Sequence, residues 1–174
     1  LFDADFGLAN VDILLGLRPE VTLDDCIFGD KKLHDIILHS TAGIDIIPGS
    51  SGIEKVANLA PEKIAALVSS FSELTGYDYF VIDTSSGISK GVISFCLASS
   101  ETIVVITSEA TSLIDAYSLV KVMAKNGYTG TVKVLVNKCV DVPTSKRTYL
   151  RFKKAVDSHL DIDVAPAGIV LRDS

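Results

Sequence analysis

Four runs of apolar and β-branched residues recur along the chain, and they predict strands. They are GIDIIP (43–48), YDYFVIDT (77–84), ETIVVIT (101–107) and VKVLVNK (132–138). The runs do not alternate cleanly between apolar and polar residues, which is typical of parallel strands that are buried on both faces. We therefore expect a mostly parallel sheet that is covered on both sides.

Segments with helical periodicity lie between these runs. In 61–75 the apolar residues recur on one helical face, and Pro61 suits the first turn. The stretch 111–126 repeats the pattern, and Gly127 is placed to cap its carboxyl end. Alternation of strands and helices predicts right-handed βαβ crossovers with helices on both faces. The fold class we expect is α/β, organised as a single domain over 1–174.

Composition and charge narrow the class of protein. Apolar residues make up 48% of the 174 residues and charged residues 22%, which is typical of an ordered soluble domain. The net charge of −6 argues against a chain that wraps nucleic acid, and we predict no direct nucleic-acid partner. Cys26, Cys96 and Cys139 lack metal-binding spacing, so we expect reduced thiols in a cytoplasmic protein. No apolar run approaches the roughly 18–20 residues of a membrane span.

Carboxylates end several predicted strands, at the edge where open parallel sheets bind ligands. Asp3 and Asp5 follow the apolar start of the chain, and Asp83 ends the run 77–84. Carboxylates at this edge hold Mg²⁺ directly or through water, and they position a water for attack on phosphorus. The alternative is that they form strand-end acidic turns. Both interpretations stay open from these residues alone.

Two further residues belong to the same candidate site. Gly87 follows Asp83 and would let the backbone approach a terminal phosphate, and Asn137 would read a base edge with its amide or form a turn. A G-x-x-x-x-G-K-[ST] phosphate loop is not present in the sequence. The Gly-Ser-Ser-Gly at 49–52 is a candidate anion-binding helix start, but it carries no lysine.

Read together, these motifs resemble the MinD/ParA class of deviant P-loop ATPases over essentially the whole chain. The matching segments are DADFGLANVDILLGL (3–17), PGSSGIEKVANL (48–59), VIDTSSGIS (81–89), ITSEATSLIDAYSLVKVM (106–123) and VLVNK (134–138). Within that class the segment GLANVD (7–12) favours the FlhG (FleN) subfamily of flagellar number and placement regulators. Placement of the cell-division site is the alternative within the same class.

The resemblance implies a function for each candidate residue. Asp5 would position the attacking water, and Asp3 would partner the phosphate-loop lysine and the Mg²⁺ shell. Asp83 would coordinate Mg²⁺, mainly through water, with Gly87 sensing the γ-phosphate. Asn137 would contact adenine.

Three departures from the family pattern affect this site. Leu171 stands where relatives commonly place a proline beside the adenine, and Ser85-Ser86 stands where they carry a small apolar pair. Ser108 and Ala110 replace prolines of the loop after the third run. A non-catalytic regulator with a degenerate nucleotide site is therefore the rival interpretation.

The resemblance also implies cofactors, partners and location. It implies a slow ATPase that uses ATP and Mg²⁺, and that switches by forming an ATP-dependent homodimer. The implied partners are an FlhF-type GTPase and flagellar basal-body or transcription components. We expect a cytoplasmic protein with a peripheral contact at the inner face of the cell membrane, made by a region outside this sequence.

The chain begins at Leu1 and its only methionine is Met123, so we interpret it as a fragment that lacks the phosphate loop at one end and is also shortened at the other. We expect it to be inactive and unstable when isolated. The segment 145–160 predicts a basic helix with Lys146 and Arg151 among its cations. It would meet anionic lipid or an acidic partner, or form a solvated face over core residues Leu150, Val156 and Leu160.

Overall fold

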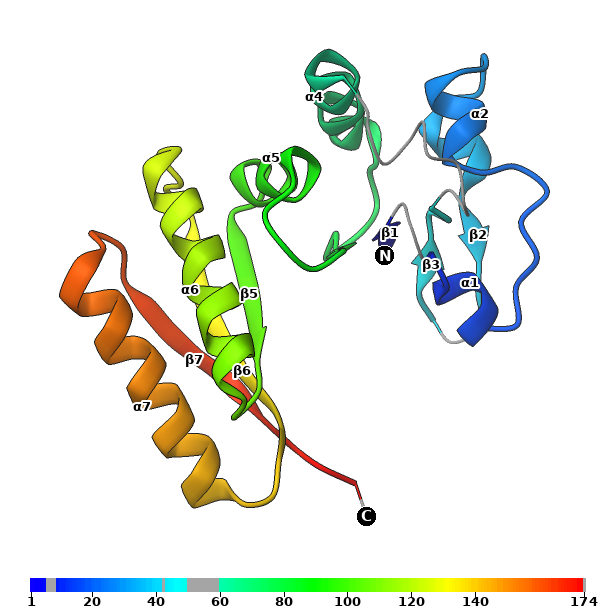
Figure 1. Ribbon diagram of the computed structural model, residues 1–174. Helices are drawn as coiled ribbons and strands as arrows, with labels where there is room; N and C mark the ends of the chain where they lie inside the picture. The colour runs from blue at the N-terminus through cyan, green and yellow to red at the C-terminus, as the bar shows by residue number, and fades with distance from the viewer. Residues whose placement is uncertain (6–8, 42, 50–59, 174) are drawn as a thin grey trace. The chain divides into compact units, whose positions relative to one another are not determined.

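The computed structural model describes residues 1–5, 9–41, 43–49 and 60–173 (Figure 1). The chain divides into two compact units. Unit 1 is Leu1–Ser86 with Lys90–Phe95, and unit 2 is Gly87–Ser89 with Cys96–Ser174. Each unit is described by itself below. The single domain expected over the whole chain stays a prediction.

Unit 1 is built around the short strand β1 (Phe2–Ala4). On one side β1 pairs in parallel with β4 (Ile82–Thr84), and on the other Phe2 forms a parallel bridge with Ile47. Ile47 directly follows β3 (Asp45–Ile46), which pairs antiparallel with β2 (Leu38–His39). Only the end of the predicted run 77–84 forms a strand, because residues 77–81 lie outside β4.

Short helices surround the strands of unit 1. They are α1 (Val11–Leu14), α2 (Leu23–Ile27), η1 (Leu33–Ile36), α4 (Pro61–Ser70), η2 (Phe71–Glu73) and α5 (Lys90–Ala98), of which Cys96–Ala98 belongs to unit 2. The helix predicted over 61–75 is confirmed, with Pro61 in its first turn and a 3-10 turn at its end.

The core of unit 1 gathers around Phe2, whose side chain is fully buried. The Phe2 ring lies edge-on to Phe71 and Phe95, with ring centroids 5.5 and 5.7 Å apart. Such edge-to-face aromatic pairs add to the free energy gained by burying apolar surface. This cluster anchors β1, which carries the first two predicted site residues, Asp3 and, just past its end, Asp5.

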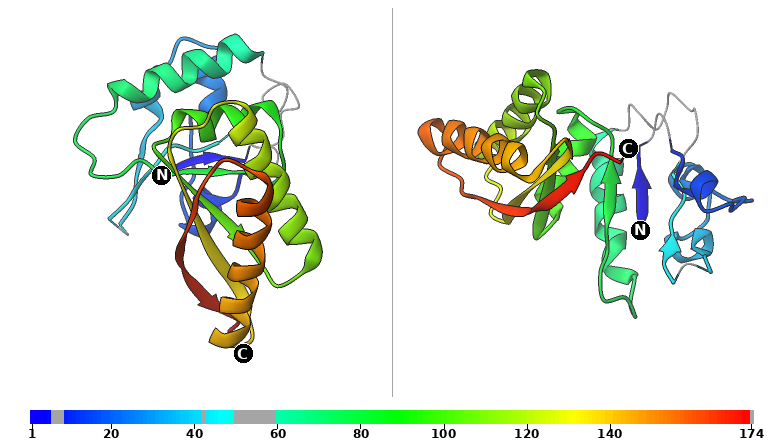
Figure 2. Two further views of the ribbon diagram at one scale, coloured as in Figure 1. Left: turned by 90° about the vertical axis from the view of Figure 1, so that its left-hand side faces the viewer. Right: turned by 90° about the horizontal axis from the view of Figure 1, so that it is seen from below.

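Unit 2 is a three-stranded parallel sheet in the order β5-β6-β7. Its strands are β5 (Glu101–Ile106), β6 (Thr131–Cys139) and β7 (Val164–Leu171), connected by α6 (Ala110–Lys125) and α7 (Val142–His159). Both helices lie on one side of the three strands (Figure 2). Two consecutive crossovers of the same hand, stepping in the same direction, place their helices in this way. The predicted strand–helix alternation is confirmed.

One face of β5 is less covered than the sequence predicted. Val104 and Ile106 are buried on the helix-covered face, whereas Ile103 and Val105 are 54% and 53% exposed. The prediction of burial on both faces is therefore wrong for this strand. The physical reason is that, in the described part of unit 2, α6 and α7 cover the sheet from the same side.

The helix ends of unit 2 follow from local chemistry. Gly127 has a φ of 75° and its N–H bonds the Ala124 carbonyl, so it caps α6 as predicted. At the start of α7 the Asp141 carboxylate accepts a hydrogen bond of 2.6 Å from the Thr144 N–H. On α7 Val156 is buried as predicted, but Leu150 is 61% exposed and Phe152 takes the core position instead.

The described residues carry no helix long and apolar enough to cross a membrane. All three cysteines are free thiols, with Cys96 and Cys139 buried and Cys26 half-buried. This agrees with the reduced thiols expected from the sequence.

Candidate functional site

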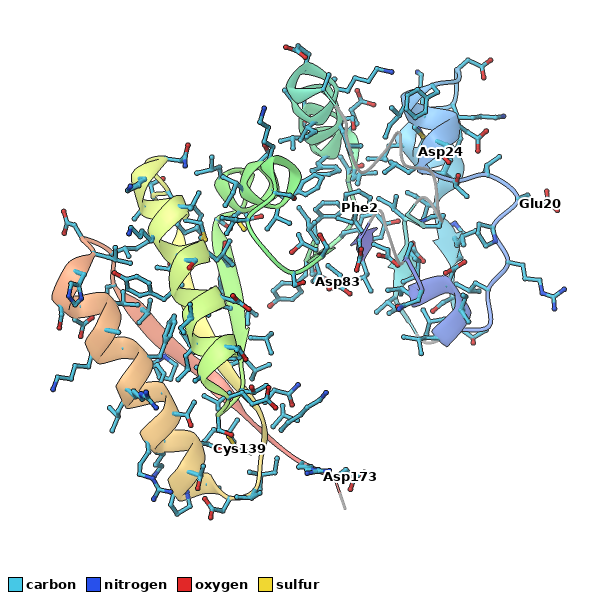
Figure 3. All side chains as sticks on the ribbon, viewed as in Figure 1. Phe2, Glu20, Asp24, Asp83, Cys139 and Asp173 are labelled. Atoms are coloured by element: carbon cyan, nitrogen blue, oxygen red, sulfur yellow. The ribbon has the colours of Figure 1, made fainter. Side chains whose placement is uncertain are left out.

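Two carboxylates meet at the carboxyl ends of β1 and β4. Asp3 and Asp83 are register partners in the parallel pair, so they lie side by side on neighbouring strands. Asp5 follows one residue after β1 ends. Figure 3 shows Asp83 on the same unit as Phe2, the core residue that precedes Asp3. Unit 1 thus brings together three of the predicted site residues.

Asp3 is held rigidly by the backbone that follows it. Its side chain is 2% exposed, and Oδ2 accepts hydrogen bonds from the Asn10 and Val11 N–H groups at 2.9 and 3.1 Å. These groups open α1, so the Asp3 carboxylate caps that helix from outside. A buried carboxylate with several N–H donors is fixed in position as well as stabilised.

A local hydrogen bond joins Asp5 to Asp3. The Asp5 N–H donates 3.3 Å to Oδ1 of Asp3, which closes a side-chain turn after Ala4. The acidic-turn interpretation therefore holds for Asp3. It does not displace Asp5 from the site, because the charge of Asp5 still acts on Asp83.

Asp83 has the electrostatics of a cation site. The residue is exposed, but partial desolvation of its carboxyl group raises its pKa, and the negative charges of Asp3 and Asp5 raise this pKa further. The described residues include no cluster of three or more groups placed to enclose a metal ion. Mg²⁺ is commonly held by one or two carboxylates together with substrate phosphates, so Asp83 fits a share of such a shell.

Gly49 supports the candidate site by lying close to the strand that carries Asp3. This close approach was not predicted from the sequence. A Cβ at Gly49 would lie 2.5 Å from the Asp3 carbonyl oxygen and 3.0 Å from the Ala9 Cβ. Only glycine permits this approach to the strand that carries Asp3. The signal in the sequence is the glycine directly after Pro48. The rest of the candidate anion site, 50–52, lies outside the described residues.

Unit 2 brings together the two predicted base-contacting residues. Asn137 pairs with Val170, and Leu171 pairs with Cys139, so Asn137 and Leu171 lie at neighbouring strand ends of β6 and β7. Asn137 is half-buried and Leu171 is 45% exposed. An amide beside an exposed apolar side chain offers both hydrogen bonding and a contact surface for a flat ring.

Lys138, next to Asn137, has unusual backbone geometry. Its φ of 56° is the one positive value among the described residues other than glycine, and the β6–β7 register shifts between Asn137 and Cys139. The Lys138 N–H donates 2.8 Å to the Asn137 side-chain oxygen. A bulge of this kind re-aims side chains and is common beside binding sites. The bulge and its hydrogen bond fix the Asn137 side chain, and they were not predicted from the sequence.

Gly87 lies in unit 2 and has a φ of 96°, a conformation that glycine adopts without strain. The segment VIDTSSGIS (81–89), which by the family resemblance corresponds to the second switch, thus contains a turn that needs glycine at this position. The carboxylates belong to unit 1, and Gly87, Asn137 and Leu171 to unit 2.

No protein-family model matches the chain, but curated proteins do, including the two that follow. The antiactivator FleN of Pseudomonas aeruginosa is 36% identical over 174 residues, covering 99% of this chain and 62% of FleN. The flagellum site-determining protein YlxH of Helicobacter pylori is 30% identical over 176 residues, covering 100% of this chain and 59% of YlxH. The chain spans less than two thirds of either relative.

Solved structures agree on the fold. The MinC:MinD cell division complex of Aquifex aeolicus matches with a TM-score of 0.74 and 24% identity, over 99% of this chain and 68% of that chain. The septum site-determining protein MinD of Pyrococcus horikoshii, complexed with Mg-ADP, matches with a TM-score of 0.69 and 26% identity, over 95% and 67%. These likenesses confirm the predicted α/β fold of the MinD/ParA P-loop class.

Proposed function

Because the chain is a member of the MinD/ParA family of P-loop ATPases, we propose that the full-length protein is an ATP-dependent dimerisation switch that regulates flagellar number or placement. It binds ATP with Mg²⁺, forms a homodimer, and returns to the monomer after slow hydrolysis to ADP and phosphate. The flagellar output is favoured over division-site placement because YlxH, which is 30% identical over the whole chain, is named a flagellum site-determining protein.

The observation that carries this proposal is the group of carboxylates at the ends of β1 and β4. Asp3 is rigid and buried, Asp83 is exposed with a raised pKa, and both lie at the sheet edge where this class of fold binds ligands. The charges of Asp3 and Asp5 contribute to raising the pKa of Asp83. A divalent cation offsets such charge, and it supplies electrostatic stabilisation of a phosphoryl group when bound.

In this proposal the three carboxylates have different functions. Asp5 accepts a hydrogen bond from the attacking water and orients it toward the γ-phosphate. Asp83 holds the Mg²⁺ hydration shell, and Asp3 keeps the turn to α1 in place while facing the phosphate-loop lysine. Asp3 can hold this turn because its carboxylate accepts hydrogen bonds from the Asn10 and Val11 N–H groups. These bonds fix the backbone near Asp5.

Three residues of unit 2 have the functions in this proposal that the family resemblance implies. Gly87 allows the second switch to reorient around the γ-phosphate, because its backbone already has a positive φ. Asn137 hydrogen bonds the adenine edge, and Leu171 packs beside the ring at the next strand end. A leucine supplies an apolar contact where relatives carry proline, so the base pocket keeps its apolar side.

The partners and location belong to the same proposal. We place the switch in the cytoplasm, with a peripheral membrane contact made by a region outside residues 1–174. The ATP-bound dimer would select an FlhF-type GTPase, and flagellar basal-body or transcription components would be further partners. Nothing in the acidic net charge of −6 favours nucleic acid as a direct ligand of the whole chain.

The test compares full-length wild type with Asp5→Ala, using Asp78→Ala on an exposed loop of unit 1 as the matched control. Phosphate release measures turnover, a fluorescent ATP analogue measures binding, and sizing with ATP measures dimerisation. We expect Asp5→Ala to lose roughly 10²–10⁴-fold in turnover while binding ATP and staying dimeric. Asp78→Ala should match wild type in all three measurements.

Two outcomes would reject parts of this proposal. If wild type neither binds nor hydrolyses ATP, the carboxylates have no catalytic function and the protein regulates through contacts alone. If complementation of a deletion strain restores septum position rather than flagellar number, the division-site function replaces the flagellar one.

A further inference from the structure

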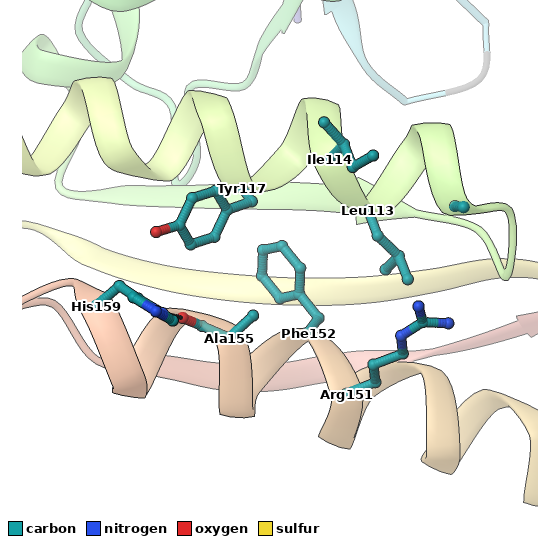
Figure 4. A pocket seen from close by; sticks show the side chains of 8 residues that line it. Leu113, Ile114, Tyr117, Arg151, Phe152, Ala155 and His159 are labelled. Atoms are coloured by element: carbon teal, nitrogen blue, oxygen red, sulfur yellow. Dashed lines mark hydrogen bonds between the residues drawn. The ribbon is translucent and has the colours of Figure 1, made fainter.

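A groove lies between the outer faces of α6 and α7 in unit 2 (Figure 4). Its volume is about 390 Å³, within the range of pockets that bind small apolar groups. The apolar side chains that line it are Leu113, Ile114, Tyr117, Phe152 and Ala155. Phe152 is 2% exposed and forms the floor, whereas Ile114 is 63% exposed.

The groove side of α6 is distinct from its core side. Ala116, Val120 and Met123 are buried against the sheet. Leu113, Ile114 and Tyr117, at helical spacing, form a second apolar stripe on the same helix. Lys121 continues that stripe one turn after Tyr117. An apolar stripe that ends in a cation is a surface to which an amphipathic segment binds.

Basic side chains from α7 line the other edge of the groove, and Arg151 is the cation among them. Arg151 and His159 belong to its lining, and Figure 4 shows the Arg151 guanidinium reaching up toward Leu113. In the part of the chain that the structure describes, Arg151 makes no salt bridge. Arg147 lies one turn earlier on the same side of α7, and its guanidinium bonds the Thr144 hydroxyl.

Asp157, the acidic residue of α7, lies away from the groove. Asp157 pairs with Lys153 at 3.1 Å, and Lys153 also pairs with Asp163 at 2.7 Å. At 100° per residue, Lys153 and Asp157 lie on the opposite side of the helix from Ala155 and Arg151. On α6 the same geometry places Asp115 away from Ile114 and Tyr117. The groove therefore has an apolar floor and a cationic edge.

From this arrangement we propose that the α6–α7 groove binds an acidic amphipathic segment of a partner protein. Apolar side chains of the segment fill the space above Phe152, between Ile114 and Tyr117. Its carboxylates meet Arg151, Arg147 and Lys121. The apolar contacts provide affinity, and the charges provide register and selectivity against basic segments.

Two other occupants fit the groove less well. A membrane surface would need a convex apolar face, and this one is concave. A second copy in a two-fold contact would bring two cationic edges of the same sign into one interface, because the same patch meets itself. A partner segment of opposite charge avoids both problems.

The test uses the full-length protein and a displayed library of random peptides of about 15 residues, a length typical of helix-in-groove ligands. The tightest selected peptide is synthesised with a fluorescent label, and its Kd is measured by anisotropy. We expect selected peptides to combine Asp or Glu with apolar residues at helical spacing. Ile114→Glu should weaken the Kd at least tenfold.

The matched control for Ile114→Glu is Leu150→Glu. Leu150 is 61% exposed on α7, close to the 63% of Ile114, but it lies outside the groove. The Leu150 variant should bind the peptide within twofold of wild type. A second pair tests the charge: Arg151→Glu should weaken the acidic peptide about fivefold or more, and Lys154→Glu, outside the lining, should leave it unchanged.

Several results would overturn the proposal. One is a set of selected peptides that bind Ile114→Glu as tightly as wild type. A second such result is that Ile114→Glu and Arg151→Glu both lose binding to phosphatidylglycerol vesicles while their peptide binding is unchanged. This result would assign the surface to lipid. A dimer seen by sizing that both variants dissociate would assign it to a second copy. ATP turnover of Ile114→Glu should equal wild type, so this test is independent of the ATPase proposal.

Discussion

Asp3 and Asp83 face each other as register partners across the parallel pair β1–β4, yet their surroundings differ. Asp3 is 2% exposed and accepts N–H groups from Asn10 and Val11. Asp83 is exposed and its pKa is raised. One carboxylate therefore supports the fold, while its neighbour keeps charge that the described residues do not neutralise. A carboxyl group with a perturbed pKa at a strand end is a candidate for a functional site.

The first prediction is that Asp83→Asn stabilises the full-length protein at pH 7 in the absence of Mg²⁺. Desolvation, then Asp3 and Asp5, raise the folded-state pKa of Asp83 above its unfolded value of about 4. The native state thus binds this proton more tightly, so stability falls as pH rises through the raised pKa. The gain from Asn should shrink as pH falls toward 4. Thermal unfolding in EDTA from pH 4 to 8 measures it.

The control for this prediction is Asp78→Asn, an exposed aspartate of the loop before β4. Its melting temperature should follow wild type at every pH. A lower melting temperature for Asp83→Asn at pH 7 would contradict the prediction, because it would mean that the ionised carboxylate makes favourable contacts that outweigh the neighbouring charges.

The second prediction is that Asp3→Ala destabilises the fold by roughly 1–3 kcal/mol. Alanine removes the acceptors of the Asn10, Val11 and Asp5 N–H groups, and the first two open α1. Buried donors without a partner carry most of that cost. Urea unfolding of the full-length protein measures the change. The exposed Asp30→Ala should stay within about 0.5 kcal/mol of wild type.

Long periodic elements could be predicted from the sequence because their signals are local. The segment 111–126 has helical spacing over several turns and a glycine at its end, and α6 forms there with Gly127 at positive φ. The strand ends could be located for a similar reason. Asp83 and Asn137 each follow an apolar run, and both lie near the carboxyl ends of strands in parallel pairs.

Features that depend on packing could not be predicted. Leu150 and Phe152 both fit an apolar helical pattern, and only the contact with the sheet places Phe152 in the core and Leu150 in solvent. The uncovered face at Ile103 and Val105 depends on which elements cross over on each side. The turn that binds Asp5 to Asp3 is invisible to periodicity, because it uses a side chain as a backbone acceptor.

The third prediction concerns Gly49. Gly49→Ala should cost roughly 1–3 kcal/mol, because its Cβ would meet the Asp3 carbonyl oxygen at 2.5 Å and backbone must move. Gly76→Ala is the comparison, because Gly76 has a φ of 86° and open space around it. This substitution should cost about 1 kcal/mol of folding free energy, which comes from the backbone conformation and not from a contact. If Gly49→Ala folds as stably as wild type, the approach to β1 is not constrained. Urea unfolding of both variants decides this.

The last prediction concerns Cys26, a half-buried thiol of α2. Burial, together with the charges of Asp25 and Asp35, raises its pKa to about 11. At pH 8 its thiolate fraction should therefore be on the order of a hundredfold below that of a free cysteine, and iodoacetamide should react correspondingly slowly. The rate should rise about tenfold per pH unit as far as the protein stays folded.

Mass spectrometry of alkylated peptides follows Cys26 separately from Cys96 and Cys139. Asp35→Asn should accelerate the reaction by removing one of the neighbouring charges, and urea-unfolded protein should react like free cysteine. Alkylation of native Cys26 at the rate of glutathione would show instead that its thiol is neither desolvated nor opposed by the carboxylates.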